Sequence, residues 1–203
     1  MAERVLACAP CHGPQGGGTA NPYFPRLSGK PAGYLYNQLV AFQEGRRRYA
    51  PMNYLLEFQT PAYLGKMAAW FAAQHPPSPP RPMVAVSDAV LAHGQDLVMH
   101  GAPDRGVPPC SGCHGPALTG MEPAIPGLVG LNSQYITAQL GAWRYGTRTA
   151  AEPDCMQLVA AHLTEEDVTA VAAWLASRPV PPDATPAPAG TLRMPLVCGS
   201  EPQ

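Results

Sequence analysis

The chain has 203 residues, 13% of them charged, and a formal net charge of -1. This length suits two small domains better than one large one. The near-neutral charge excludes strong attraction to nucleic acid or to a membrane surface, and no apolar run is long enough to span a bilayer. The 26 prolines favour short helices joined by loops rich in turns.

The first chemical signal along the chain is a short cysteine and histidine motif that occurs twice. It reads Cys8-Ala9-Pro10-Cys11-His12 and returns as Cys110-Ser111-Gly112-Cys113-His114. Cys-x-x-Cys-His is the attachment signature of c-type haem. The two thiols add across the vinyl groups of one porphyrin, and the histidine ligates the iron. The two copies predict two covalently bound haem c groups, with His12 and His114 as iron ligands.

Other chemistries fit the two motifs less well. A zinc site built from both cysteine pairs would leave the two histidines without a role. A redox dithiol belongs beside a βαβ pattern, which this sequence lacks. A disulfide scaffold needs a higher density than six cysteines in 203 residues, and four of these are spaced too closely for ordinary disulfides.

The motifs belong to a longer repeat with an offset of about a hundred residues. Self-similarity of this kind indicates two copies of one structural plan. The matched elements are Pro25-x-Leu27-x-Gly29 with Pro126-x-Leu128-x-Gly130; Tyr34, Gln38 and Leu39 with Tyr135, Gln139 and Leu140; Gly45 and Arg47 with Gly146 and Arg148; and Ala69-Trp70 with Ala173-Trp174.

A run of prolines after His75 separates the copies. Consecutive prolines favour extended polyproline geometry and form a stiff connector, which would keep the two irons at a short, fixed distance. We therefore expect an N-terminal haem domain over 1–75, a Pro-rich linker over 76–86, a C-terminal haem domain over 87–179 and a Pro-rich tail over 180–203.

Helix signals occur throughout both copies, and no convincing alternating strand is present. Thr60 is placed to cap a helix that begins with Pro61, and Ser87 to cap one from Asp88 to about His100. Asn132 or Ser133 precedes another helical pattern, and Thr164 to Asp167 resembles a capping box. The sequence predicts an all-α fold in which each haem supplies much of the buried apolar surface.

Methionine is the usual sixth ligand of a low-spin electron-transfer haem, because its soft sulfur favours ferrous iron. The ligand should lie in a loop between the middle and last helices of each copy. Met52 and Met156 meet this expectation, at nearly equal spacing from Cys8 and Cys110. Met67 is the rival in the first copy, but it lies on the apolar face of the last helix and is assigned to core packing.

The remaining methionines and histidines are assigned to packing or to the surface. Among them His162 is the strongest reserve ligand, because it lies near Met156 in the sequence. The set comprises Met83, Met99, Met121, Met194, His75, His93, His100 and His162.

Arg47 and Arg148 recur at matching positions and are candidates to hold haem propionates through charge-assisted hydrogen bonds. The alternative is a solvated position at the C-terminal end of a helix, where the helix dipole favours basic residues. Cys155 and Cys198 remain outside the haem motifs, and the simplest prediction is a disulfide that ties the tail beside Met156. The alternative is Cys155 as a thiolate ligand of iron.

The residues quoted resemble the cytochrome c4 family, in which two class I cytochrome c domains stand in tandem. The motifs that carry the resemblance are Cys8-Ala-Pro-Cys-His-Gly13, Pro25-Arg-Leu-Ser-Gly29, Tyr34-Leu-Tyr-Asn-Gln-Leu39 and Gly45-Arg-Arg-Arg48, with their second-copy partners. The resemblance covers the chain to about Pro179. It implies domains related by a pseudo-twofold axis, and carbonyls of Pro25 and Pro126 that fix the ligating imidazoles.

The resemblance implies an electron carrier and not an enzyme. Its expected partners are a donor dehydrogenase or quinol-oxidising complex and a terminal oxidase. Because thioether-linked haem is generally installed outside the cytoplasm, the expected location is the periplasm, after removal of a signal peptide that is absent from this sequence. Two features depart from the family, namely the tail with Cys198 and the position of Cys155 beside Met156. They keep open a catalytic or enzyme-associated di-haem subunit, for example of a thiosulfate dehydrogenase.

Overall fold

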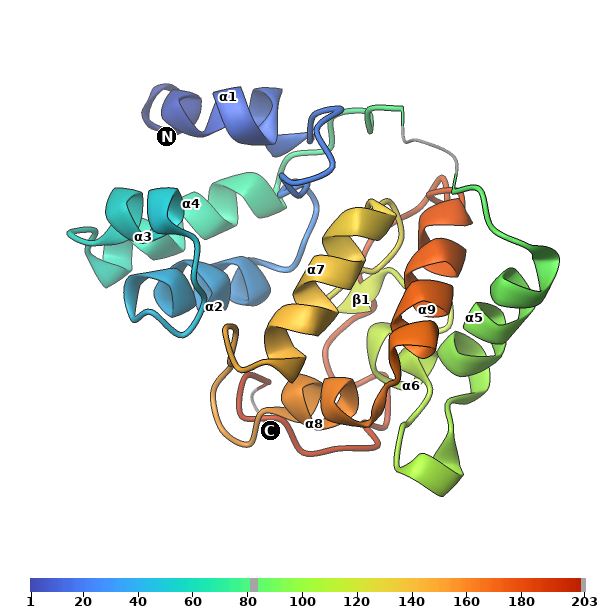
Figure 1. Cartoon of the computed structure of the whole chain (residues 1–203). Coiled ribbons are helices and arrows are strands. Elements are labelled where there is room, and N and C mark those ends of the chain that lie inside the picture. Colours follow the sequence, from blue (N-terminus) through green and yellow to red (C-terminus); the bar gives the residue numbers. More distant parts are fainter. Residues whose placement is uncertain (81–83, 202–203) are drawn as a thin grey trace.

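The computed structural model describes residues 1–80 and 84–201. Figure 1 shows two groups of helices, with the N-terminal half of the chain on one side and the C-terminal half on the other. The centre of the predicted linker, residues 81–83, lies outside the described residues, and Met83 with it. The rest of the linker that is described has no helix or strand.

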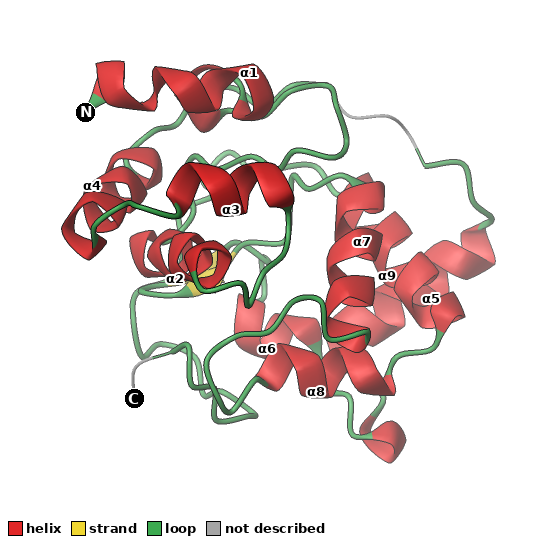
Figure 2. Ribbon diagram, turned by 60° about the vertical axis from the view of Figure 1, so that its left-hand side comes forward, coloured by secondary structure: helices red, strands yellow, loops and turns green. Residues whose placement is uncertain are grey.

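The described part of each half is mainly helical, as predicted (Figure 2). The N-terminal half contains η1 (Ala2–Cys8), α1 (Ala9–His12), η2 (Pro14–Gly16), α2 (Ala32–Gln43), α3 (Ala50–Leu56) and α4 (Pro61–Ala72). The C-terminal half contains α5 (Asp88–His100), η3 (Pro103–Arg105), α6 (Cys110–His114), α7 (Ser133–Arg144), α8 (Cys155–His162) and α9 (Glu165–Ser177).

One feature of the local structure was not expected from the sequence, and one expectation was wrong. A short antiparallel pair exists, in which β1 (Gly120–Met121) pairs with β2 (Ile125–Pro126). The two-residue strands are too short for an alternating pattern to reveal. Met52 and Met156 also lie in the first turns of the short helices α3 and α8, and not in loops.

The predicted helix caps are confirmed. The side chains of Thr60, Ser87 and Asn132 each accept a hydrogen bond from a backbone N–H in the first turn of α4, α5 and α7. Thr164 and Asp167 form the complete capping box of α9. These side chains satisfy donors that the first turn of a helix leaves free, so the helices begin where the sequence places them.

Each half of the chain has a hydrophobic core of its own. The N-terminal core gathers α2, α3 and α4 around Leu64 and includes Met67, which is 7% exposed and packs as predicted. The C-terminal core lies where α5 crosses α9. Gly94 makes this crossing close, because a Cβ there would stand 2.1 Å from the carbonyl oxygen of Ala170. Each copy of the repeat therefore packs around its own core.

Segments from both halves meet along an interface beside α2 and α7. The backbones of Arg47 and Arg148 form an antiparallel bridge, and the N–H of Thr149 donates to the carbonyl of Arg46 over 2.7 Å. Gly33 of α2 approaches the β1–β2 turn so closely that a Cβ would lie 2.6 Å from the carbonyl oxygen of Pro123. The two domains therefore pack together along hydrogen-bonded backbone.

The Pro-rich tail packs against the C-terminal domain and continues to the domain interface. Ala187 exchanges backbone hydrogen bonds with Gly120 and Glu122, and the end of the tail returns beside α8 (Figure 1). Among the described residues, no helix combines the length and the apolar character needed to cross a membrane.

Candidate haem sites

The histidines of the two Cys-x-x-Cys-His motifs are held in the same way. Nδ1 of His12 donates to the carbonyl oxygen of Pro25 over 2.9 Å, and Nδ1 of His114 donates to that of Pro126 over 2.7 Å. Each bond fixes the ring and leaves Nε2 free to ligate a metal. Burial lowers the pKa of both imidazoles, with a further contribution from Arg47 at His12 and from Lys30 at His114. The neutral ring is the form that ligates iron.

Three of the four motif cysteines have a thiol pKa that burial raises. Burial raises the pKa of Cys110 to about 12 and also raises that of Cys8 and Cys113. A reactive dithiol instead requires a lowered thiol pKa. Within residues 1–80 and 84–201, no three side chains of the types His, Cys, Asp and Glu gather in a group that could hold a metal ion.

A cavity of about 200 Å³ lies in the C-terminal domain, between its motif and α8. Cys110, Cys113 and His114 line it from the motif, and Met156 lines it from α8. The rest of the wall is largely apolar, as a buried prosthetic group requires. The lining includes Leu128, Leu131, Ile136, Leu140, Val159, Leu163, Val171 and Leu175. The histidine and methionine predicted as axial ligands thus border one apolar space.

In the N-terminal domain, Met52 and Cys8 pack against the same hydrophobic core. Asn53, which follows Met52, fixes the start of α3. Its side chain accepts from the N–H of Tyr49 over 2.8 Å and donates to the carbonyls of Phe42 and Arg47. These bonds tie the beginning of α3 to the end of α2 and set the position of Met52.

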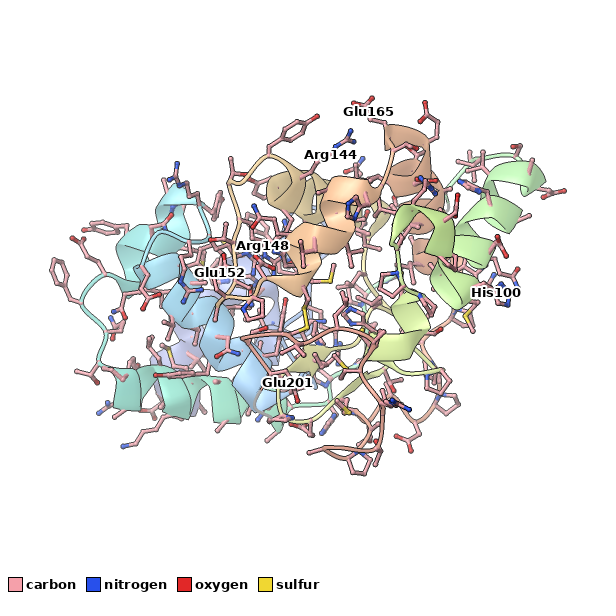
Figure 3. The ribbon with its side chains drawn as sticks, turned by 90° about the horizontal axis from the view of Figure 1, so that it is seen from below. His100, Arg144, Arg148, Glu152, Glu165 and Glu201 are labelled. Atoms are coloured by element: carbon pink, nitrogen blue, oxygen red, sulfur yellow. A yellow bond between two sulfur atoms is a disulfide. The ribbon has the colours of Figure 1, made fainter. Side chains whose placement is uncertain are left out.

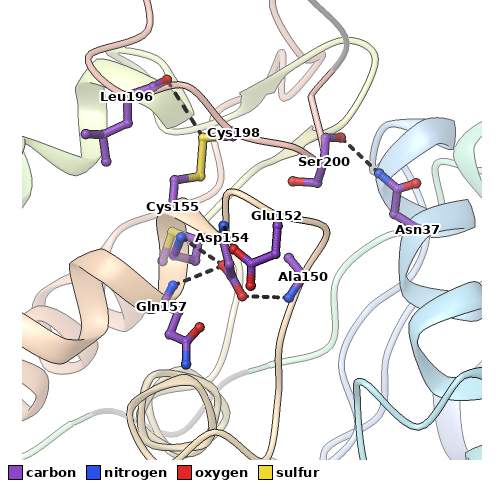
Figure 4. Close-up of a disulfide and its surroundings, with 10 residues drawn as sticks. Asn37, Ala150, Glu152, Asp154, Cys155, Gln157, Leu196, Cys198 and Ser200 are labelled. Carbon is purple, nitrogen blue, oxygen red and sulfur yellow. Dashed lines mark hydrogen bonds between the residues drawn. A yellow bond between two sulfur atoms is a disulfide. The ribbon is translucent and has the colours of Figure 1, made fainter.

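Met156 is positioned by a different device, the carboxylate of Asp154. This side chain is 3% exposed and caps α8 by accepting from the N–H groups of Met156 and Gln157 over 3.1 and 3.0 Å. It also accepts from the N–H of Ala150 (Figure 4). This cap was not predicted, because Met156 was expected in a loop. An Asp directly before a helix is a typical N-cap residue, and Asp154 was the signal available in the sequence.

Cys155 and Cys198 form the predicted disulfide, with Cα atoms 5.3 Å apart (Figure 4). The bond occupies the sulfur of Cys155, which removes the alternative of a thiolate ligand while the disulfide is intact. His162, the reserve ligand, is an exposed residue at the end of α8.

Arg47 and Arg148 are buried, with exposures of 8% and 4%, so the alternative of a solvated helix end is wrong. Figure 3 places Arg148 between the two domains. The guanidiniums join matching glutamines and tyrosines of both copies. The bonds run from Arg47 to Gln38 (2.9 Å), Gln139 (2.8 Å) and Tyr135 (2.8 Å), and from Arg148 to Gln139 (2.7 Å), Gln38 (2.7 Å) and Tyr34 (3.5 Å).

Exchanging the two copies maps this set of bonds onto itself. The network therefore follows the pseudo-twofold symmetry that relates the two domains. In the sequence, only the repetition of Tyr, Gln and Arg at matching positions was visible. The role of the two arginines in joining the domains was not among the two alternatives that the sequence suggested, a propionate contact or a solvated helix end. The recurrence of Tyr, Gln and Arg together in both copies could have indicated a contact between the domains.

Two observations test whether the residues present fit a haem in the C-terminal cavity. The indole Nε1 of Trp143, which lines the cavity, is buried without a hydrogen-bond partner among the described residues. The Nζ of Lys30, from the N-terminal domain, also reaches this cavity and donates to the carbonyl of Gly127 over 3.3 Å.

Burial lowers the pKa of Lys30 to about 8, with further lowering by Arg26, Arg47 and Arg148 and an opposing effect of Tyr135. In the described part of the chain, Lys30, Arg47 and Arg148 take part in no ion pair with a carboxylate. The buried N–H of Trp143 and the unpaired positive charges of these side chains would be stabilised by an anion that has carboxylate oxygens. Haem propionates have this chemistry, so the residues fit the group.

Comparison with known proteins assigns the chain to a family. The pattern of the family described as Cytochrome c matches residues 3–88. The thiosulfate dehydrogenase electron acceptor of Thiomonas intermedia (strain K12) is 36% identical over 178 residues, which cover 88% of this chain and 81% of that protein. Reduced recombinant cytochrome c4 from Pseudomonas stutzeri superposes with a TM-score of 0.73 and 30% identity, over 86% of this chain and 94% of that one.

This chain belongs to the cytochrome c4 family. It therefore carries two covalently bound haem c groups and transfers electrons. A third likeness is to thiosulfate dehydrogenase (TsdBA) from Marichromatium purpuratum in its as-isolated form, with a TM-score of 0.76 and 34% identity over 88% of this chain. This chain spans only 39% of the length of that protein.

Proposed function

We propose that this cytochrome c4 relative carries single electrons in the periplasm from a thiosulfate dehydrogenase to a terminal acceptor such as an oxidase. The observation that carries the proposal is the paired arrangement of ligands, in which each motif histidine is fixed by a proline carbonyl and each copy offers a methionine at the start of a short helix. The names of the relatives from Thiomonas intermedia and Stutzerimonas stutzeri support this donor.

The residues proposed to hold the haems are those of the two motifs with their methionines. Cys8, Cys11, His12 and Met52 would serve the N-terminal haem, and Cys110, Cys113, His114 and Met156 the C-terminal one. Each iron, when the haem is bound, supplies one-electron chemistry between its ferric and ferrous forms. The protein fixes both axial groups in advance, so little rearrangement accompanies the gain or loss of an electron.

The side chains at the domain interface are proposed to hold the propionates. Lys30 and Arg148 line the C-terminal cavity, and Trp143 offers it an unpaired N–H. Arg47 lies in the same network and is the equivalent candidate for the N-terminal haem. Charge-assisted bonds from these groups would orient both haems toward the interface. Transfer between the haems would then take place within one rigid unit.

A docking surface for the donor is proposed on the N-terminal domain beside Met52. Tyr54, Leu55 and Phe58 on and after α3 are 75%, 54% and 85% exposed. Large apolar side chains exposed together mark a site of protein association. Since Met52 lies in the same helix, a partner bound there would stand close to the N-terminal haem.

The test is rapid-mixing reduction of the oxidised protein by a thiosulfate dehydrogenase supplied with thiosulfate. We expect both haems to be reduced, and Phe58→Ala to lower the second-order rate constant about tenfold by removing a contact of the docking surface. Tyr145→Ala is the matched control, since Tyr145 is 72% exposed on the C-terminal domain. Both variants should keep the potentials of the wild type.

The same experiment separates the carrier from the alternative of a catalytic subunit. Thiosulfate without the dehydrogenase should leave the protein oxidised, because no open coordination position is expected at either iron. Turnover of thiosulfate by this chain alone would contradict the carrier role and favour an enzyme.

A further inference from the structure

We propose that residues 191–198 of the tail form a strap that closes the C-terminal haem site, and that the Cys155–Cys198 disulfide holds this strap in place. The proposal rests on the His114–Met156 site described above. It assigns a role to the two features that depart from the family, the tail and its disulfide.

The strap has one face toward the protein and one toward solvent. Residues Leu192, Met194, Leu196 and Cys198 are buried or half-buried, whereas the intervening Thr191, Arg193, Pro195 and Val197 are exposed. The inward residues are all apolar, so this alternation matches a segment that covers an apolar surface.

The covered surface is the haem cavity. Met194, Leu196 and Cys198 line the cavity together with His114 and Met156. Leu192 lies over the attachment motif, with its Cδ1 3.8 Å from where a Cβ would stand on Gly115. Pro195 is largely exposed, but its Cγ also lies within 3.7 Å of where a Cβ would stand on Gly112. The strap therefore runs from the cysteine side of the haem site to its methionine side.

The two ends of the strap are anchored separately. Before it, Ala187 exchanges backbone hydrogen bonds with the β1 region. After it, Cys198 is bonded to Cys155 in α8, and Ser200 accepts from the side chain of Asn37 over 3.0 Å (Figure 4). The disulfide is the covalent anchor, and it is attached one residue before Met156. Without it, the far end would be held by single hydrogen bonds, each of small net effect.

The N-terminal domain provides an internal contrast. Pro10 and Cys11 of its attachment motif are exposed, whereas their equivalents Gly112 and Cys113 are half-buried. The strap thus shelters the C-terminal haem and leaves the N-terminal haem as the one that solvent and partners reach. Electrons would enter and leave through the N-terminal domain while the disulfide is intact.

The test is the rate at which imidazole enters the two ferric haem sites, followed by loss of the near-infrared band of methionine bound to iron. The wild type should react in two phases of equal amplitude, one fast and one slow. In the variant Cys155→Ser with Cys198→Ser, the tail is present without its covalent anchor. Its slow phase should accelerate about tenfold, which corresponds to loss of about 1.4 kcal/mol of closure. A chain ending at Gly190 with Cys155→Ser should merge both phases.

A matched pair of substitutions within the strap separates covering from general destabilisation. Leu196→Ser alters an inward residue and should accelerate the slow phase, whereas Val197→Ser alters an outward residue that is 64% exposed and should not. The fast phase of the N-terminal haem serves as the control in every variant, and the far-ultraviolet circular dichroism should be unchanged.

Two results would overturn the strap. A single phase in the wild type would show that the haems are equally accessible, and an unchanged slow phase after truncation would show that the tail covers nothing. Failure of the underlying haem site is distinguishable, since a wild type with only one methionine-bound haem would overturn the His114–Met156 assignment itself.

Discussion

The two domains hold the same ligand frame in different surroundings. His12 and His114 meet their proline carbonyls at nearly equal distances, yet Met52 is placed by the side chain of Asn53 and Met156 by Asp154 with a disulfide alongside. The support of the histidine is thus repeated, whereas the contacts that position the methionine proposed as the second ligand differ. A duplicated domain can change exposure and potential around each haem while the ligands remain the same.

Exposure differs between the two regions. In the N-terminal domain, Tyr54 and Leu55 of α3 and Phe58 just after it are exposed. In the C-terminal domain, α8 exposes a single large apolar side chain, Leu158, and the tail lines the cavity beside Met156. The C-terminal cavity also has an indole donor in Trp143 where the N-terminal repeat has Phe42. We therefore expect two haems that are alike in ligation and unlike in access.

The largest effect should come from replacing, one at a time, the two methionines proposed as ligands. Met52→His and Met156→His should each lower the potential of one haem by roughly a few tenths of a volt, because imidazole favours ferric iron more than thioether sulfur does. A spectroelectrochemical titration would resolve the two haems and assign them. Met67→Leu is the control, and a shift of either potential by that variant would contradict the assignment of Met52.

Next in size is the loss of a shared acceptor between the domains. Gln139→Leu removes an oxygen that accepts from both buried arginines. Unpaired buried charges are costly, and we expect the free energy of unfolding to fall by about 3 kcal/mol. Gln38→Leu should have a matching effect because of the pseudo-twofold symmetry. Chemical denaturation checks both, and a large effect of only one variant would break the symmetry of the comparison.

A third prediction concerns Asp167, which only the C-terminal domain has at this position, since Tyr63 stands in its place in the first copy. Burial alone would raise the pKa of Asp167, but bonds from Arg105, from the N–H of Thr164 and from His93 outweigh it and hold the pKa well below its usual range. Asp167→Asn should lower the free energy of unfolding by about 2 kcal/mol at neutral pH.

The sign of the pH dependence follows from this depressed pKa. The contribution of Asp167 is fully present above the ordinary carboxyl pKa, about 4, and is lost only as the pH falls through the lower pKa of the folded protein. The difference between wild type and variant in free energy of unfolding should therefore not shrink between neutral pH and pH 5. A difference that disappears before the pH reaches the ordinary carboxyl range would contradict the proposed ion pairs.

The smallest expected effect is electrostatic. Lys30→Met removes a cation beside the C-terminal cavity, which should stabilise the ferric haem and lower its potential by on the order of 40 mV, equivalent to roughly 1 kcal/mol. The potential of the N-terminal haem should change less. Lys66→Met is a control at an exposed residue of α4. An equal shift of both haems would show that Lys30 acts on the whole protein and not on one site.

The sequence predicted the features that depend on local patterns. The helix caps at Thr60, Ser87 and Thr164 follow from short-range hydrogen bonding, and the Cys155–Cys198 disulfide followed from the two cysteines left outside the motifs. The helical character of each copy followed from apolar periodicity, which tertiary packing then preserved.

Features that depend on contacts between distant residues could not be predicted in this way. Arg47 and Arg148 were expected near a propionate or in solvent, and their hydrogen bonds across the interface became visible only when both copies were placed together. Lys30 has no counterpart in the second copy, where Leu131 occupies the matching position. The repeat therefore did not indicate that Lys30 is important. The inward face of the strap likewise depends on how the tail returns to the domain.

The most direct test of the whole account is the near-infrared band of methionine bound to ferric iron, measured against haem content in the oxidised protein. Two haems per chain with two equivalents of this band would agree with His12–Met52 and His114–Met156 ligation and with an electron carrier. A single equivalent, or a reduced haem that binds carbon monoxide readily, would contradict the paired sites and favour a catalytic haem.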